Sequence, residues 1–139
     1  MGAGSPAAPA GSSTACQRSY FDGVLAERIK SLEEGAFDVT LLRRGDPVGD
    51  PAGLTFSSGG RPLGALRFRF FPDSELFVVE SVVDDGCRIV ADFFNEARPD
   101  FPKDRLQTNN TLNVRFGSSG YRVHFVHDSG LFKLRFGRA

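Results

Sequence analysis

The sequence has 139 residues, 40% of them hydrophobic, with 14 Phe, no Trp and a formal net charge of zero. This length and apolar content fit a single domain with one core, and they exclude a disordered chain. No apolar run approaches the roughly 20 residues that span a bilayer. We therefore expect a soluble protein with no membrane partner.

The first segment, residues 1–14, contains only Gly, Ala, Ser, Pro and Thr after the initial Met. It lacks the apolar stretch of a secretory signal and the Arg residues of a mitochondrial presequence. We therefore expect a disordered leader over residues 1–17 and a single globular domain over residues 18–139.

The helical spacing of Phe21, Leu25, Ile29 and Leu32 predicts a first helix over residues 19–34. Ser19 and Asp22 have the spacing of a capping box at its start. Such a helix has one apolar face and would lie on a sheet.

Alternating apolar and polar residues then predict four strands. They lie at residues 37–43, 54–58, 63–71 and 76–83, with a Gly59-Gly60 turn between the second and the third. The fourth strand is apolar throughout except for Glu80, which is typical of a strand covered on both faces.

Asp84-Asp85-Gly86 ends this strand and supplies N-cap residues for a second helix that extends to Ala97. The buried stripe of this helix would contain Ile89, Val90, Phe93, Phe94 and Ala97. Residues 98–110 are polar and should be irregular.

Three alternating strands follow, at residues 112–116, 121–125 and 131–136, with short turns that favour antiparallel pairing. The predicted fold is therefore α+β. Two helices would pack on a predominantly antiparallel sheet of six to seven strands, in the order α-ββββ-α-βββ.

The charges are distributed unevenly. Residues 1–102 carry 10 basic and 15 acidic side chains, whereas residues 103–139 carry 7 basic and 2 acidic ones. Several cations alternate with apolar residues on predicted strands, and they define a candidate binding surface: Arg67, Arg69, Arg115, Arg122, Lys133 and Arg135. Such a surface suits an acidic protein or a single-stranded nucleic acid, although a solvated strand face shows the same alternation.

The two cysteines, Cys16 and Cys87, are too few for a small disulfide-stapled domain. We therefore expect both to be reduced and the protein to be intracellular. The sequence contains no CxxC motif or Cys/His cluster, and we expect no metal or other cofactor.

Cys87 at the start of the predicted second helix is a candidate nucleophile, since the helix dipole lowers a thiol pKa. His124 would be the base, and Asp128 or Asn113 could orient it. The alternative function is thus a cysteine hydrolase or transferase. In the other interpretation, Cys87 is a small buried residue at a helix start.

A hairpin, an apolar strand and a helix in succession resemble the centre of the GNAT acetyltransferases. In that family a glycine-rich turn binds the pyrophosphate of coenzyme A. The corresponding stretch, residues 86–91, has Val90 and Ala91 where glycine is needed. This resemblance implies a second alternative, a degenerate GNAT-like acyltransferase.

Among these hypotheses we favour a non-enzymatic binding or adaptor module that presents a basic C-terminal β-meander. The expected partner is a protein, with nucleic acid as the alternative.

Overall fold

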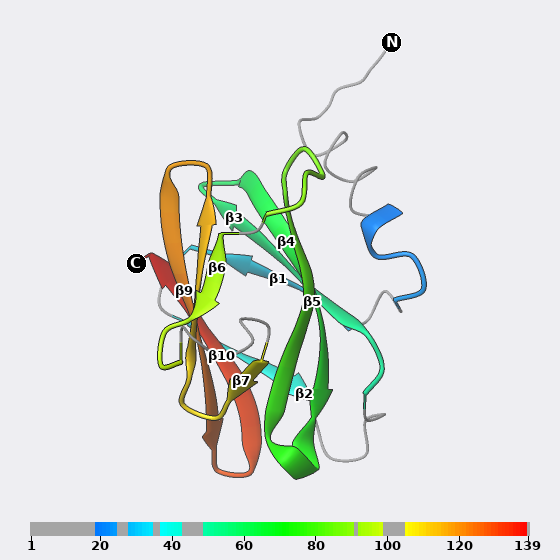
Figure 1. The fold of residues 1–139 in the computed structure, drawn as a ribbon, viewed down its shortest axis with the longest axis vertical. Helices are drawn as coiled ribbons and strands as arrows, with labels where there is room; N and C mark the ends of the chain where they lie inside the picture. The colour runs from blue at the N-terminus through cyan, green and yellow to red at the C-terminus, as the bar shows by residue number, and fades with distance from the viewer. Residues whose placement is uncertain are drawn as a thin grey trace.

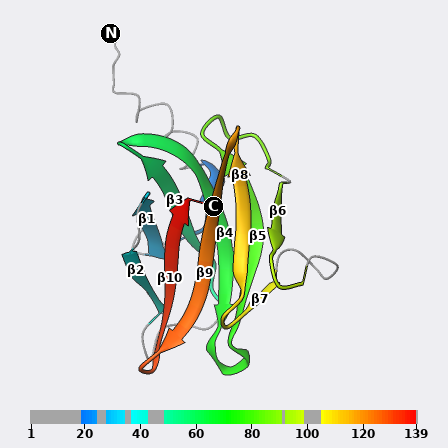
Figure 2. The same cartoon turned by 90° about the vertical axis from the view of Figure 1, so that its left-hand side faces the viewer.

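The computed structural model describes residues 19–24, 28–34, 37–42, 49–90, 92–98 and 105–138, so the predicted leader lies outside the described residues. The described chain forms two facing five-stranded sheets, a β-sandwich (Figures 1 and 2). The predicted α+β fold, with two helices on one sheet, is therefore wrong.

Sheet A has the strand order β1-β3-β4-β5-β7, and sheet B has the order β2-β10-β9-β8-β6. The strands of sheet A are β1 (Ile29–Glu33), β3 (Ala52–Ser58), β4 (Arg61–Phe71), β5 (Leu76–Asp84) and β7 (Arg105–Gln107). Those of sheet B are β2 (Phe37–Leu42), β6 (Phe93–Asn95), β8 (Thr111–Phe116), β9 (Ser119–Asp128) and β10 (Leu131–Arg138). The pairing of β1 with β3 is parallel, and the other strand pairs are antiparallel.

Strand β1 and a short turn stand where the first helix was expected. Of the four apolar residues that suggested one helix face, Leu25 lies outside the described residues, and the other three lie on opposite sides of sheet A. Leu32 belongs to the main core between the sheets, whereas Phe21 belongs to a small outer cluster that Ile29 also packs against. A spacing of three or four residues fits both arrangements, and here burial on two sides of a sheet decides in favour of the strand.

A loop and the short strand β6 occupy the region of the second predicted helix. Asp84 does cap backbone groups, but it accepts hydrogen bonds from Gly86 N and Arg88 N in a tight turn. Cys87 has a positive φ of 65°, which a helix interior excludes. The chain then turns back toward β5, and Ile89 forms an antiparallel β-bridge with Val83.

The predicted strands are found as β2, β3, β4, β5 and the final meander β8-β9-β10. The polar segment expected to be irregular contains β7, which pairs with β5. Between β4 and β5, Pro72–Ser74 forms a short 3₁₀ helix, η2.

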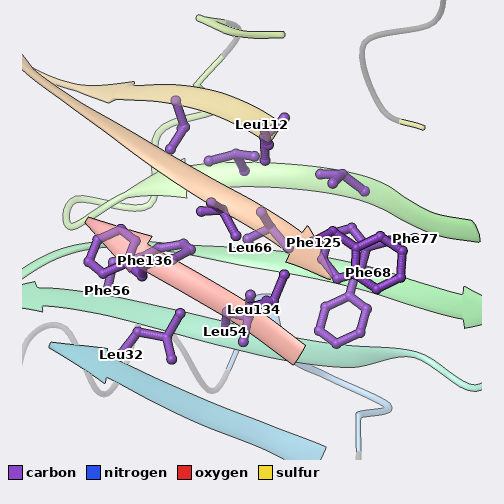
Figure 3. Close-up of a cluster of buried hydrophobic side chains, with 14 of the residues drawn as sticks. Leu32, Leu54, Phe56, Leu66, Phe68, Phe77, Leu112, Phe125, Leu134 and Phe136 are labelled. Carbon is purple, nitrogen blue, oxygen red and sulfur yellow. The ribbon is translucent and has the colours of Figure 1, made fainter. Parts of the chain in front are cut away.

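Phenylalanine side chains fill much of the space between the sheets. Figure 3 shows residues of both sheets meeting there, among them Phe68 and Phe77 of sheet A beside Phe125 of sheet B. The Phe68 and Phe77 rings are stacked with centroids 4.5 Å apart, and Phe77 lies 5.5 Å from Phe125. This core holds the two sheets together and leaves each with one outer face.

The outer face of sheet A is partly covered by Ser19–Val24, which we call the N-terminal strap. Backbone hydrogen bonds from Asp22 to Ser19 and from Val24 to Phe21 give the strap its turns. The Phe21 ring lies so close to Gly53 that a Cβ atom there would be 2.2 Å from the ring. No helix in the described part of the chain is long and apolar enough to cross a membrane.

Candidate binding face

The outer face of sheet B carries four of the six predicted binding residues. Arg115 lies on β8, Arg122 on β9, and Lys133 and Arg135 on β10. Their neighbours Val114, Val123 and Leu134 are buried in the core. Because side chains alternate along a strand, the four cations share the outer surface. We call this surface, defined by these four cations, the meander face.

Strand register determines how this surface is arranged. Arg122 of β9 pairs with Asn113 of β8, and Arg135 of β10 pairs with His124 of β9. The Thr111 Oγ1 and His124 Nδ1 atoms are 3.3 Å apart, and the two residues are themselves a register pair. The cations therefore come from the three central strands of sheet B.

Carboxylates stand at the margins of the meander face. Glu96, just after the edge strand β6, accepts two hydrogen bonds from Arg122, at 3.0 Å from Nε and 2.8 Å from Nη2. Asp92, just before β6, is 3.2 Å from Arg115, and Asp128 at the end of β9 is 3.6 Å from Lys133. The ion pairs of Arg115 and Arg122 are exposed, so they orient these cations more than they stabilise the fold.

The Glu96 carboxylate shows the effect of this arrangement. Asn113 Nδ2 donates a hydrogen bond of 2.9 Å to the same Oε2 atom that accepts from Arg122 Nε. The Asn113 hydrogen bond, followed by those from Arg122, lowers the pKa of Glu96 below its usual value against the opposing effect of desolvation. The Arg122 guanidinium is thus held in a fixed orientation by a partner that stays ionised.

A pocket opens on the same face beside the edge strand. Its lining residues are Asp92, Phe94, Asn113, Val114, Arg115, Gly120 and Tyr121. Phe94 is 39% exposed and is one of the large apolar side chains that the described surface leaves in solvent. Arg115 pairs with Gly120, which has no side chain to fill the space beside it. The pocket therefore joins an aromatic surface to a guanidinium and an amide.

The other two predicted cations, Arg67 and Arg69, lie on β4 of the opposite sheet. Arg69 Nε is 2.8 Å from Glu80 Oε2, and Arg67 Nε is 3.9 Å from Glu80 Oε1. Arg67 also donates to the backbone oxygen of Tyr20 in the strap. The structure does not bring these two arginines together with the meander face.

The candidate catalytic residues do not form a nucleophilic site. Cys87 is disulfide-bonded, so its sulfur is no thiolate nucleophile, and the prediction of a reduced Cys87 is wrong. The other cysteine, Cys16, lies outside the described residues. His124 faces outward from sheet B beside Thr111, and Asp128 pairs with Lys133. The helix that the GNAT resemblance requires is also absent from residues 84–90 and 92–97.

Within the described residues there is no group of three His, Cys, Asp or Glu side chains that could hold a metal ion. Phe94, Asp92 and Glu96 were not predicted as site residues, because their sequence pattern indicated a helix for all three. The available signal for a strand was the adjacent pair Phe93 and Phe94, since aromatic residues favour strands. A strand of three residues is too short to be distinguished from a helical stripe.

Comparisons with protein-family models, with curated proteins and with solved structures find no match to this chain. The arrangement of its own residues therefore carries the functional argument.

Proposed function

We propose that the chain is a non-catalytic binding module whose meander face binds an acidic surface of a protein partner. The observation that carries the proposal is the placement of the charges. The cations Arg115, Arg122, Lys133 and Arg135 project from the three central strands, while Asp92, Glu96 and Asp128 stand at the margins.

The pocket favours a protein partner over a nucleic acid. Protein interfaces use aromatic and Arg side chains as central anchors, surrounded by polar contacts. Phe94 and Arg115 line one pocket here. A phosphate polymer binds mainly by charge neutralisation, and the carboxylates Asp92 and Glu96 beside the cations weaken the field that it would follow.

The experiment compares Arg122→Glu/Arg135→Glu with a control double variant of the same charge change, Arg61→Glu/Arg88→Glu. Arg61 begins β4 and Arg88 lies in the loop after β5, and both are exposed and off the meander face. Each variant and the wild type are used to capture partners from lysate, after circular dichroism has verified folding. We expect the meander-face variant to capture at least tenfold less partner than the wild type, and the control variant to capture the same amount as the wild type.

Two further measurements test the kind of partner. The Phe94→Ser variant should capture less of the partner than the wild type does, since the substitution removes the aromatic anchor without changing the charge. A short single-stranded DNA should bind the wild type weakly. If instead the DNA binds tightly, with an affinity that falls steeply with salt, the partner is a nucleic acid. Unchanged capture by the meander-face variant would contradict the proposal as a whole.

A further inference from the structure

We infer that Asn109 is a site of N-linked glycosylation. Asn109-Asn110-Thr111 is the Asn-x-Thr acceptor tripeptide, with a residue other than Pro in the middle. The sequence has four Asn residues, and none of the others is followed two positions later by Ser or Thr. This inference is independent of the binding function proposed above.

The structure places this tripeptide where a glycan can be carried. Asn109 is exposed, at the turn between β7 and β8. Its φ is 75°, a left-handed conformation that Asn tolerates better than most residues. Its backbone N–H donates to Phe125 O at 2.7 Å, so the backbone is anchored while the side chain faces solvent.

The neighbouring asparagines show the contrast. Asn95 is 2% exposed, and its Nδ2 donates to Arg105 O and to Asn110 Oδ1. Asn110 Oδ1 also accepts from Gln107 N, and Asn113 Nδ2 donates to Glu96. The side-chain amides of Asn95, Asn110 and Asn113 therefore make hydrogen bonds within the fold. The acceptor residue of the tripeptide, Asn109, is exposed at a turn.

The second observation concerns the compartment. Cys87 is disulfide-bonded, and structural disulfides persist mainly in the secretory pathway and outside the cell. This is also the route on which proteins receive N-linked glycans. The same finding removes the reduced cysteines on which the prediction of an intracellular location depended.

The modification is a group transfer from a lipid-diphosphate-linked oligosaccharide. The Nδ2 atom of Asn109 forms a bond to the first carbon of the terminal sugar. The bond from that carbon to the diphosphate oxygen breaks, the lipid diphosphate leaves with the bonding electrons, and Nδ2 gives up one proton to a base. No electron transfer or other co-reactant is needed.

The fold also restricts when transfer takes place. The acceptor tripeptide includes the Thr111 hydroxyl, but Thr111 is 6% exposed in the folded chain and lies 3.3 Å from His124 Nδ1. A transferase can therefore reach both Asn109 and the Thr111 hydroxyl only before β8 pairs with β9. Transfer must occur on the unfolded chain, after which the glycan remains at the exposed turn.

The test is expression of the full chain, preceded by a cleavable signal peptide, in cultured eukaryotic cells. The secreted protein is digested, and peptides are analysed by mass spectrometry before and after treatment with a glycoamidase in heavy-oxygen water. We expect a glycopeptide that the enzyme converts to a labelled Asp at position 109. A parallel digestion without reduction should show Cys87 in a disulfide.

Matched variants locate the site. Asn109→Asp removes the acceptor but keeps a residue that tolerates positive φ, and Thr111→Val removes the hydroxyl; both should abolish the glycan. Thr111→Ser keeps the tripeptide and should retain it. A secreted chain with Cys87 oxidised and Asn109 unmodified would overturn the inference. So would protein purified from the cells that make it, if its Cys87 is a free thiol and its Asn109 is unmodified.

Discussion

The two outer faces of the sandwich differ in the contacts that their side chains make. On sheet A, the strap covers the surface with Phe21, and Tyr20 donates to Ser81 O at 2.6 Å and accepts from Arg67 N at 3.1 Å. On sheet B, the cations of the meander face are exposed or half-buried in the described part of the chain, and they are held by marginal carboxylates such as Glu96. An outer face occupied by its own chain uses apolar burial and hydrogen bonds, one of them from the Arg67 guanidinium to Tyr20 O, whereas the meander face, as the structure describes it, is polar and charged.

The same substitution on each face should have very different effects on stability. Phe21 is 5% exposed in the outer cluster, and Phe94 is 39% exposed in the pocket. We expect Phe21→Ala to lower the free energy of unfolding by about 3 kcal/mol and Phe94→Ala by about 0.5 kcal/mol at most. Urea denaturation measures both values. Equal losses would mean that the strap does not cover its face in solution.

Gly53 allows a second test of the strap. A Cβ atom at Gly53 would lie 2.2 Å from Phe21 Cε1, so Gly53→Ala must displace the ring. We expect a loss of about 2 kcal/mol, with faster proteolysis of the chain before residue 28. Gly86→Ala is the control, because its Cβ would meet no atom closer than 3.5 Å. A strap that resisted protease equally in both variants would contradict this packing.

Tyr20→Phe removes only the hydroxyl that joins the strap to sheet A, at a cost of about 1 kcal/mol. Burial raises the pKa of Tyr20 above its usual value of 10.0, against smaller opposing effects from its hydrogen bonds to Ser81 and Arg67. Because the folded-state pKa is raised, this contribution is fully present below pH 10 and is lost as pH rises through the folded-state pKa. The difference in free energy of unfolding between wild type and variant, measured by urea denaturation, should therefore become smaller above pH 10. Parallel curves would show that the phenol is not buried.

Glu96→Gln should have a small effect on stability, because the ion pair that it breaks is exposed. We expect a loss of about 0.5 kcal/mol at pH 7. The pKa of Glu96 is lowered by its contacts with Asn113 and Arg122, so its contribution is present above the unfolded-state pKa and disappears as pH falls through the folded-state value. A double-mutant cycle with Arg122→Gln measures the pair. A coupling that persists at acid pH would contradict the assignment.

The meander was predictable because its alternation is long and regular. Strands β8, β9 and β10 each bury one set of alternate residues, and their turns are short. That pattern also placed Arg115, Arg122, Lys133 and Arg135 on one surface. The sequence pattern did not reveal the marginal carboxylates Asp92 and Glu96, because their positions depend on the edge strand β6, which is three residues long.

Both helix predictions were wrong, because the periodicity of a sequence does not show which tertiary contacts a segment makes. Phe21 and Leu32 have helical spacing but are buried on opposite sides of sheet A. Asp84 is a good helix cap, yet Cys87 at φ 65° and the bridge from Ile89 to Val83 turn the chain back to the sheet. In each case tertiary contacts with a sheet outweigh local propensity. The second sheet was equally hidden, since alternation does not reveal which strands pair.

The position of β10 has a consequence for synthesis of the protein. This strand, the last that the structure describes, lies between β2 and β9 in sheet B. It pairs with a strand 90 to 99 positions earlier, from Phe132 beside Leu42 to Phe136 beside Phe37. Pairings so distant in sequence close slowly, and sheet B cannot be completed until Leu131–Arg138 have left the ribosome. The domain should therefore fold only after translation has passed this strand, with its phenylalanine core exposed to chaperones until then.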